Sequence, residues 1–587
     1  MPKIWLKLIF GGSLVLLAAA FGKPEPTVGL SPEAILASYP KDYFSSPVDD
    51  ALKLTGTFGE LRPDHFHSGI DIRSKTGGVG QPVFAAAAGH VDRIKVQASG
   101  YGNVLYLKHP NGYTTVYAHL DRFSPELEQF VREEQYKKER FEVDLQPSDG
   151  QFKIRQGQEI GKLGNSGGST GPHLHFEIRN SATQKGLNPL LFGLPVPDKE
   201  APDIRDLKAY FLSEKREVAA TRDLQVVRKG ANQYGVVGDT LLIGAWRVGF
   251  GVKTFDQMSG FRNENGIFAL SLAVNDELAY EWRMAELDFD ETRYLNAHVD
   301  YPARKKGGGW YQRCFVLPGD KLSNYTRTDG LGLVPLYREK ASKISIKVLD
   351  TGGNASMLEF WVKRNEAMES YASQPYQYEF NYDVDNKIET NDLSLFLPQG
   401  VLYESLPFQY NTMQDASSGI YSPVHHLHNN RTPAHRYFDI ALRAYNLPDA
   451  LRSKAVVAHC GSGRPENCGG TWKGEMLGTR IRNFGDYCVM VDTLAPKIVP
   501  VVFDDDMRRK NSMSFRISDN FAVGGSANGL AYRGMVDGKW ILFEYDKKRD
   551  RLTHYFDGRI GAGEHLLRLT VTDDRQNEAV FERRFVR

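Results

Sequence analysis

Three short stretches, HFHSGID at 65–71, VYAHL at 116–120 and GPHLHFE at 171–177, decide the fold of the first part of this chain. His67 and Asp71 are four residues apart, and His173 and His175 are two apart. In an extended strand both spacings put the two side chains on one face, because successive residues alternate between faces. The stretches therefore predict β-strands that present both pairs to a common point.

The side chains in these stretches are of the types that a divalent metal ion binds. Zinc accepts imidazole nitrogens and carboxylate oxygens together, and a catalytic zinc site has three protein ligands and one open position. Five residues, His67, Asp71, His119, His173 and His175, are more than such a site needs as ligands. The pattern indicates a hydrolytic metal site, in which histidines that bind no metal transfer protons near neutral pH.

Two residues near these ligand candidates can each be interpreted in two ways. Glu177 shares the predicted strand face of His173 and His175, and it is either a partner that orients a ring or an edge carboxylate without such a contact. His65, two residues before His67, is either a substitute ligand or a surface residue at the mouth of a groove.

Two other segments suggest binding but are interpreted more simply. The loop GNSGGSTGP at 164–172 lacks the lysine of a phosphate-binding loop, and we interpret it as the wall of a groove. A later histidine cluster has no partner aspartate nearby and is interpreted as a surface loop; its members are His425, His426, His428 and His435.

Length and charge limit the classes of protein that this chain can be. At 587 residues it is too long for one hydrophobic core, and roughly four domains are expected. It has 73 Lys and Arg residues against 72 Asp and Glu residues, so its net charge is +1. A chain without a strong overall field is not drawn to nucleic acid or to anionic lipid, and no nucleic-acid partner is expected.

The first residues have the pattern of a secretory signal peptide, which we place at 1–23. Lys3 and Lys7 precede an apolar run, and Ala18 and Ala20 form a small-residue cleavage signal. The apolar run is short for the ~20 residues of a membrane-spanning helix, which makes an uncleaved anchor the lesser alternative. We expect an exported mature protein without a transmembrane segment.

The next part of the chain alternates short β-rich runs with glycine turns, which predicts antiparallel hairpins. We expect a leader at 24–50 and then an all-β domain at 51–200. One segment departs from this pattern: Ser124 and Pro125 begin a stretch dense in Glu, Lys and Arg. A serine cap followed by proline starts helices, so a helical insertion is predicted at 124–146.

Beyond the proline-rich segment LPVPDKEAPDI at 194–204, the pattern predicts tandem immunoglobulin-like β-sandwiches. Two hairpins share one design, in which an aspartate after a strand is followed four residues later by an asparagine: Asp350 with Asn354, and Asp573 with Asn577. We place an immunoglobulin-like sandwich at 201–366, a β-sandwich at 367–497 and a second immunoglobulin-like sandwich at 498–587. The predicted fold class is all-β.

Four cysteines, Cys314, Cys460, Cys468 and Cys488, lie outside the histidine stretches and are not part of the metal site. In an oxidising compartment Cys460 could pair with Cys468, or Cys468 with Cys488. Free or partly buried thiols are an equal alternative, and the spacing does not decide among these.

Between Phe58 and Pro189 the chain resembles the lysostaphin-type, or LytM-like, zinc endopeptidases of bacterial cell walls. The stretches that carry the resemblance are FHSGIDI, PVFAAAAGHV, GYGNVLYLKH, TTVYAHL, QGQEIGKLGNSGGSTGPHLHFEIR and NPLLF. It implies an antiparallel β domain of the duplicated hybrid motif type. It also implies that His67, Asp71 and His175 bind Zn²⁺, while His119 and His173 are the unbound catalytic pair. The charged insertion departs from the shorter members of the family.

The same resemblance implies a secreted zinc metalloendopeptidase that hydrolyses peptide cross-links of peptidoglycan, between D-alanine and diaminopimelate. The expected location is the periplasm or cell envelope of a Gram-negative bacterium, with the later sandwiches positioning the enzyme or binding an envelope protein. Two alternatives remain: a non-enzymatic cell-wall scaffold or regulator of other wall hydrolases, and a general protease acting on glycine-rich proteins.

Overall fold

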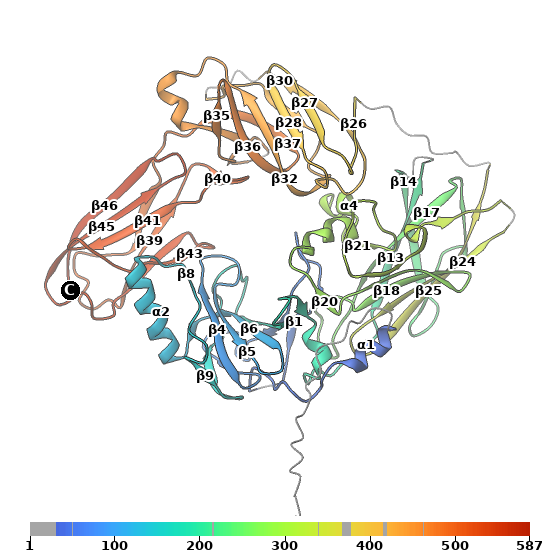
Figure 1. Cartoon of the computed structure of the whole chain (residues 1–587), viewed down its shortest axis with the longest axis horizontal. Coiled ribbons are helices and arrows are strands. Elements are labelled where there is room, and N and C mark those ends of the chain that lie inside the picture. Colours follow the sequence, from blue (N-terminus) through green and yellow to red (C-terminus); the bar gives the residue numbers. More distant parts are fainter. Residues whose placement is uncertain are drawn as a thin grey trace, which may run out of the picture.

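The computed structural model describes residues 31–49, 51–213, 217–338, 340–366, 377–414, 419–461 and 463–587. The expected signal peptide, 1–23, lies outside them. Four modules follow one another: the first (31–200), the second (201–366), the third (377–492) and the fourth (497–587). Figure 1 shows them arranged as a ring in which the fourth module lies beside helix α2 (Pro125–Lys138) of the first. The predicted fold class is confirmed, because strands dominate all four modules.

The first module is built on an antiparallel sheet with the order β1-β2-β11-β6-β5-β4-β8. Its strands are β1 (Leu54–Gly56), β2 (Ile70–Arg73), β11 (His173–Asn180), β6 (Tyr113–Leu120), β5 (Asn103–Lys108), β4 (Gly89–Val96) and β8 (Val143–Leu145), with β9 (Lys153–Ile154) and β12 (Gly186–Leu187) at its margins. A smaller sheet contains β3 (Pro82–Phe84), β10 (Glu159–Lys162) and β7 (Arg122–Phe123). Both sheets bury apolar side chains in one core, which fixes the strands that carry the histidines.

Helix α2 is the predicted insertion, and it is shorter than 124–146. Ser124 precedes it, Pro125 is its first residue, and Leu127 and Val131 are buried against the sheets. The helix ends at Lys138 because Glu139 adopts a left-handed conformation with φ of 46°. The following residues return to the main sheet as β8, which pairs with β4.

The described part of the expected leader is packed against the first module. Helix α1 (Pro32–Ser38) is capped by Ser31, whose hydroxyl accepts a hydrogen bond from the Ala34 amide. Ile35, Phe44 and Val48 are almost fully buried in the same core as the strands. Residues 31–49 therefore contribute to the stability of this module.

The second module contains a 12-stranded sheet system around its own core. Its longer strands are β13 (Asp203–Leu212), β14 (Val218–Arg228), β17 (Arg247–Phe255), β18 (Ala269–Val274), β19 (Glu277–Arg283), β24 (Ser342–Leu349) and β25 (Ala355–Arg364). The shorter ones are β15 (Gln233–Val236), β16 (Thr240–Ile243), β21 (Tyr311–Arg313), β22 (Tyr325–Thr328) and β23 (Val334–Pro335), with helices α3 (Leu295–His298) and α4 (Tyr301–Lys305). Strand β20 (Glu286–Leu287) pairs with β12, so the first and second modules share a sheet.

The third module packs a five-stranded sheet and a six-stranded sheet around one core, with a two-stranded ribbon, β26 (Tyr378–Phe380) and β29 (Leu406–Phe408), beside them. The first sheet contains β27 (Asn386–Glu389), β28 (Leu393–Leu397), β32 (Pro433–Arg443), β36 (Met476–Asn483) and β35 (Thr471–Lys473). The second contains β30 (Tyr410–Met413), β31 (Val424–Leu427), β37 (Gly485–Val491), β33 (Ala455–His459), β34 (Glu466–Asn467) and β40 (Ala522–Val523). Because β40 comes from the chain after residue 497, the third and fourth modules are also joined by strand pairing.

The disulfide in the third module differs from both pairings considered above. Cys460, just after β33, is bonded to Cys488 on β37, whereas Cys468 and Cys314 are buried free thiols. The antiparallel pairing of β33 with β37 places Ala458 opposite Cys488 and so brings Cys460 within reach. Sequence spacing could not select this pair, because it depends on which strands become neighbours.

The fourth module consists of two four-stranded antiparallel sheets around a core of their own. One has the order β38 (Lys497–Val502), β39 (Ser512–Ser518), β44 (Arg551–Tyr555), β43 (Glu544–Asp546). The other has the order β42 (Lys539–Trp540), β41 (Ala531–Val536), β45 (Glu564–Thr572), β46 (Glu578–Val586). Among the described residues, no helix combines the length and apolar character needed to cross a bilayer.

Contacts between the fourth module and the first close the ring seen in Figure 1. Trp540 meets the ring of Tyr136 on α2, with 5.2 Å between centroids. The Arg559 guanidinium lies over the same ring, 4.0 Å from its centroid, and Arg533 forms an ion pair with Glu139. The helical insertion is therefore part of the surface on which the fourth module docks.

Candidate metal centre

Strands β2 and β11 bring two of the three quoted stretches together. They pair antiparallel, with Asp71 directly opposite His175. Gly69, between His67 and Asp71, allows this close approach: a Cβ atom there would lie 2.5 Å from the Phe176 carbonyl oxygen. Ile70 and Ile72 of β2 point into the core, so Asp71 faces the opposite side. His67 lies before β2 begins, which differs from the prediction that one strand carries both His67 and Asp71.

The side chains of His67, Asp71 and His175 converge on one point. His67 Nε2 lies 3.0 Å from Asp71 Oδ1 and 3.0 Å from His175 Nδ1, and the last atom lies 3.0 Å from Asp71 Oδ1. Ligands held tetrahedrally at zinc distances of 2.0–2.2 Å lie about 3.3 Å apart. The three atoms thus have the spacing and the chemistry of a zinc ligand set.

Each ring is oriented by a hydrogen bond on its other nitrogen. His67 Nδ1 donates to the Thr57 carbonyl at 2.8 Å, which leaves Nε2 directed at the convergence point. His175 Nε2 donates to Glu177 Oε1 at 2.9 Å, so its Nδ1 faces Asp71. All three ligand candidates are more than nine-tenths buried, which holds these orientations against water.

His119 reaches the site through an irregularity in β6. Tyr117 on this strand points into the core, and regular alternation would send His119 to the same side. Instead the register between β5 and β6 shifts between Asn103 and Leu105, and His119 has a φ of +60°. This conformation is unusual for a residue with a side chain and is often found at functional sites. It turns the His119 ring to 4.8 Å from that of His173 and 5.9 Å from that of His175.

His119 and His173 are both anchored through Nδ1. His119 Nδ1 donates to the Ser166 carbonyl at 2.9 Å, and His173 Nδ1 donates to the Gly171 carbonyl at 2.8 Å. The Nε2 atom of His173 lies 3.3 Å from Asp71 Oδ1. Both carbonyls belong to the loop at 164–172, so this loop positions the pair as well as forming a wall of the site.

Glu177 is the centre of a buried polar network behind His175. It is fully buried and accepts hydrogen bonds from Ser68 Oγ at 2.6 Å and from the Tyr101 hydroxyl at 2.5 Å. Arg179 Nε donates to its second oxygen at 2.6 Å. Sequence reasoning missed Tyr101, Ser68 and Arg179, although the two-residue alternation on β11 extends from His173 to Arg179 and could have indicated the last of them.

The electrostatics of the site favour positive charge at the convergence point. Burial opposes a charge on His175, but hydrogen bonds to Asp71 and Glu177 outweigh it and raise its pKa to about 9. Burial likewise opposes the charge of Asp71, yet His67 and hydrogen bonds from the neighbouring histidines hold the pKa of Asp71 well below its usual range. A proton or a metal cation can supply the positive charge that these carboxylates stabilise.

His119 has the opposite electrostatic character. Its burial, reinforced by the nearby rings of His175 and His173, lowers its pKa to about 3. The ring is therefore neutral at neutral pH and has one unprotonated nitrogen. Such a group can accept a proton from a neighbouring donor.

The second module supports the segment that carries His67. The amide of Phe66 donates to Thr292 Oγ1 at 2.9 Å, and the amide of Gly266 donates to Thr57 Oγ1 at 2.9 Å. Phe66 itself is buried in the core of the second module, 6.2 Å from Trp282 between ring centroids. The first metal-ligand candidate is therefore held in place from two modules.

The fourth module contacts the loop at 164–172. Lys548 Nζ donates to the Asn165 carbonyl at 2.5 Å and to the Ser169 carbonyl at 3.0 Å. Ser169 Oγ lies 3.2 Å from His173 Nδ1. The fourth module thus contacts the same loop whose carbonyl groups orient His119 and His173.

The other histidines lie outside the convergence point. His65 is half-exposed and pairs with Asp64 at 2.7 Å, so it is a surface residue. The later cluster is not a surface loop: His425 and His426 are on strand β31, and His425 is fully buried. The prediction of a surface loop was wrong there because the polar histidines obscured the two-residue alternation of a β-strand.

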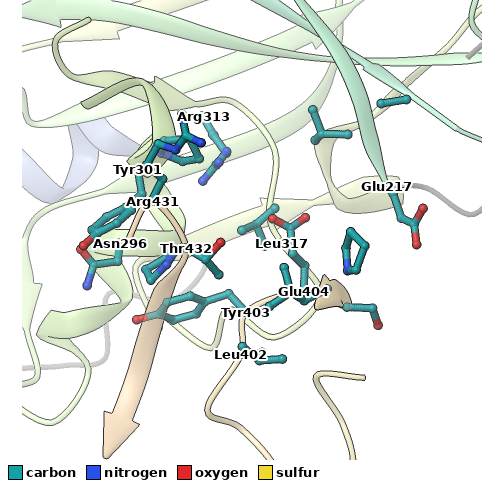
Figure 2. A pocket seen from close by; sticks show the side chains of 17 residues that line it. Glu217, Asn296, Tyr301, Arg313, Leu317, Leu402, Tyr403, Glu404, Arg431 and Thr432 are labelled. Atoms are coloured by element: carbon teal, nitrogen blue, oxygen red, sulfur yellow. The ribbon is translucent and has the colours of Figure 1, made fainter. Parts of the chain in front are cut away.

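A separate cavity of about 230 Å³ lies between the second and third modules (Figure 2). Its lining includes Glu217 and Arg313 from the second module and Tyr403 and Glu404 from the third. None of the five predicted site residues lines it. It contains no counterpart of the convergent histidines and aspartate.

Two families match separate parts of the chain. Residues 65–136 and 144–189 match peptidase family M23, and residues 377–492 match the Zu5-like domain. The first match contains all five predicted site residues, and the gap in it lies at the end of the helical insertion. The resemblance inferred from the sequence motifs is thereby confirmed for the first module.

Individual relatives each match about a quarter of the chain. The DD-carboxypeptidase/endopeptidase Mpg of Neisseria meningitidis is 34% identical over 26% of this chain and 28% of its own length. The murein hydrolase activator NlpD of Escherichia coli is 33% identical over 24% of this chain and 29% of its own length. A zinc-containing peptidase from Vibrio cholerae of known structure is 26% identical over 25% of this chain and 39% of its own, with a TM-score of 0.19. The chain thus spans less than a third of each of the two curated relatives.

Proposed function

We propose that the peptidase family M23 domain at the start of this chain is a zinc-dependent endopeptidase that hydrolyses peptide cross-links of peptidoglycan. The observation that carries the proposal is the convergence of His67 Nε2, Asp71 Oδ1 and His175 Nδ1, each 3.0 Å from the others. Two further imidazoles, on His119 and His173, stand beside that point. A structural zinc site would be closed by four protein ligands, whereas this set leaves one position for water and substrate.

His67, Asp71 and His175 would hold the zinc ion. When bound, zinc acts as a Lewis acid that acidifies a water molecule and polarises a carbonyl group. Glu177 keeps the His175 ring in one orientation, and Thr57 does the same for His67. Mutation of such outer partners typically lowers metal affinity or activity by about 10–100-fold.

His119 and His173 would transfer protons. Each has Nδ1 fixed on a backbone carbonyl, so each offers Nε2 to the site. The neutral ring of His119 is suited to accept a proton, and His173, which is more exposed than the ligands, is placed to meet the substrate. The pair would share the base and acid roles that amide hydrolysis requires.

The substrate and location are proposed from the relatives and from the N-terminal pattern. The Neisseria relative is named a carboxypeptidase and endopeptidase, and the Escherichia coli relative a murein hydrolase activator. We therefore propose peptidoglycan as the substrate, with the bond between D-alanine and diaminopimelate as the one cleaved. Export to the periplasm or cell envelope of a Gram-negative bacterium fits the basic and apolar start of the chain.

The later modules would position the peptidase or bind an envelope protein. The fourth module supports the immunoglobulin-like interpretation. Its own strands, in chain order and without β40, can be lettered A, B, C, C′, D, E, F and G. The two sheets then have the orders A-B-E-D and C′-C-F-G, which are those of the immunoglobulin fold. The module has no convergent catalytic group like that of the first, within the residues that the structure describes. Binding is therefore the role that we propose for it.

A second candidate function is regulation of other wall hydrolases. The contact of Lys548 with the loop at 164–172 favours it, because this loop orients both unbound histidines. An activator would use the same domain as a docking surface and would not turn over substrate.

Digestion of purified sacculi distinguishes the two functions. We expect wild-type protein to release un-cross-linked muropeptides, to lose this activity with a chelator and to regain it with zinc. The matched variant Asp71→Asn should be inactive, while a change of the exposed Glu126 on α2 to Gln should have no effect. No release by the wild type under any metal condition would exclude the enzyme, and faster cleavage of oligoglycine peptides than of muropeptides would favour a general protease.

A further inference from the structure

Two groups of aspartates at module junctions share one arrangement. The first consists of Asp198, Asp256 and Asp350, and it lies where the first module meets the second. The second consists of Asp492, Asp519 and Asp573, and it lies where the third module meets the fourth. In each group one carboxylate oxygen per residue lies within 4.8 Å of the others.

The sequence repeats the same three elements at both junctions. Asp198 and Asp492 each begin a D-x-x-A-P segment that leads into the first strand of the next module. Asp256 and Asp519 directly follow the strands β17 and β39. Asp350 and Asp573 follow β24 and β45 and begin the two D-x-x-x-N turns noted in the sequence. The second and fourth modules therefore present equivalent residues to the linker that precedes each of them.

The turn asparagines hold the third aspartate of each group in place. Asn354 donates from its amide nitrogen and its side chain to the two oxygens of Asp350, at 2.8 and 2.9 Å. Asn577 does the same to Asp573, at 2.8 and 2.7 Å, and its side chain also donates to the Asp492 carbonyl at 3.0 Å. The Asp350 and Asp573 carboxylates are thus held in place, each with an oxygen close to the other two aspartates of its group.

Several of these oxygens are buried without a hydrogen-bond partner. Asp492 is fully buried, and within the described residues neither of its carboxylate oxygens has a partner. The same is true of one oxygen of Asp256, which is 1% exposed, and of one oxygen of Asp198. Asn265, which pairs with Asp256 through the backbone, has a buried and unpaired side-chain oxygen as well. A buried carboxylate oxygen without a partner is costly unless a cation or a proton meets it.

No side chain in the described ranges supplies that cation. Among the described residues, none of the six aspartates has a lysine, arginine or histidine nitrogen within ion-pair distance. Burial raises the pKa of Asp256 to about 8 and that of Asp492 to about 6, and neighbouring carboxylates reinforce both shifts. Three acidic groups in one buried place repel one another, and a divalent ion removes that repulsion.

We propose that each junction binds one hard divalent cation, Ca²⁺, through its three aspartates. Calcium takes six to eight oxygen ligands at about 2.3–2.6 Å, so ligands on opposite sides of one ion lie about 4.6–5.2 Å apart, and the oxygens of each group lie within that span. The absence of sulfur and imidazole from both groups disfavours zinc and copper. Magnesium needs a smaller and more regular set of ligands. Modules outside the cytoplasm commonly bind Ca²⁺ with dissociation constants of about 10⁻⁴–10⁻³ M.

Binding would fix the angle between modules. Each site joins a linker residue to two strand ends of the following module, so an ion ties the linker to that module's edge. Both junctions lie in the ring that brings Lys548 to the loop at 164–172. Calcium would therefore stabilise the closed ring, whatever reaction the first module catalyses.

Calcium binding can be measured on the full chain by equilibrium dialysis with radioactive Ca²⁺ after passage over a chelating resin. We expect two bound ions per chain at 10 mM Ca²⁺. Asp256→Asn should remove the ion at the first junction and Asp492→Asn the ion at the second, so that the double variant binds none. The exposed Asp383 changed to Asn is the matched control and should keep both. No binding at 10 mM, or two ions in the double variant, would overturn the proposal.

Thermal unfolding separates a cation site from a structural role. Without Ca²⁺, Asp492→Asn should unfold at the same temperature as the wild type or higher, because it removes a buried charge. With Ca²⁺, the wild type should gain several degrees. The Asp492 variant, which keeps only the ion at the first junction, should gain less, and the double variant should gain nothing. A variant that loses stability equally with and without Ca²⁺ would show a structural role and contradict the proposal. If the Asp256 and Asp492 variants do not fold, the partly buried Asp198 changed to Asn supplies the same test for the first junction.

Discussion

Replacing Glu177 by glutamine tests the network that orients His175. In the wild type, one oxygen of Glu177 accepts hydrogen bonds from His175, Ser68 and Tyr101, and the other accepts from Arg179. Glutamine keeps the shape but replaces one acceptor oxygen with a donor NH₂ group and removes the charge. Either Arg179 or the group around His175 then faces a donor where it needs an acceptor.

The size of the effect follows from burial. Arg179 is only 8% exposed, and removing one partner of a buried ion pair costs about 3–5 kcal/mol. The Phe289 ring, 4.3 Å from the guanidinium, offsets part of this loss. We therefore expect a cost near the lower limit, about 3 kcal/mol, which lowers the unfolding temperature of a module of this size by about 6–12 °C. Zinc affinity should fall by about 10–100-fold, as is usual for outer partners of metal ligands.

The assay has two parts. Thermal unfolding of the metal-free protein reports the lost ion pair, and competition with a chromogenic chelator reports zinc affinity. In the double variant Glu177→Gln/Arg179→Met the unpaired positive charge of Arg179 is removed, so stability should recover in part while zinc affinity stays low. Glu126→Gln on the exposed face of α2 is the control. A Glu177→Gln protein that binds zinc as tightly as the wild type would refute the role given to this network.

Three further predictions follow from other parts of the structure. His119→Ala should keep zinc but lose turnover in muropeptide digestion, whereas Asp71→Ala should lose both; an active His119→Ala enzyme would contradict the proton-transfer role. Lys548→Ala should speed amide hydrogen exchange in the loop at 164–172 by about 5-fold, because the partly exposed contact that it removes is worth about 1 kcal/mol; unchanged exchange would show that the contact is not formed in solution. Burial lowers the pKa of His298 to about 4, so between pH 6.5 and 4 the unfolded chain binds a proton that the folded chain does not. Acidification through this range should therefore lower the free energy of unfolding of the second module by about 3 kcal/mol. His298→Gln should reduce this pH dependence, as measured by thermal unfolding at several pH values.

Much of the first module was predictable because its signals are local. Alternation with a period of two puts His173 and His175 on one face of β11, and the serine and proline at 124 and 125 start the helix where expected. These features depend on backbone geometry within one element. The position of His119 was not predictable in this way, because a bulge and a left-handed residue turn its ring away from the face that alternation gives it.

Features that depend on which strands become neighbours could not be predicted from the sequence either. Cys460 pairs with Cys488 because β33 and β37 are adjacent in a sheet, and nothing in the spacing of the cysteines says so. The core role of residues 31–49 and the burial of His425 likewise depend on what packs over them. The Asp350 and Asp573 turns were visible in the sequence, but their carboxylate partners were not.

The sequence by itself determined which groups are present and, where a strand is regular, on which of its faces they lie, because a side chain's face then depends only on its place along an extended backbone. It also determined the β-rich architecture, through the alternation of apolar residues and the glycine turns. Only the tertiary structure decided which distant faces meet: β2 with β11 at the metal centre, the fourth module with the loop at 164–172, and linker aspartates with the strand ends of the next module. The physical reason is that these contacts form between segments far apart in the chain, and the packing that selects them belongs to the whole fold.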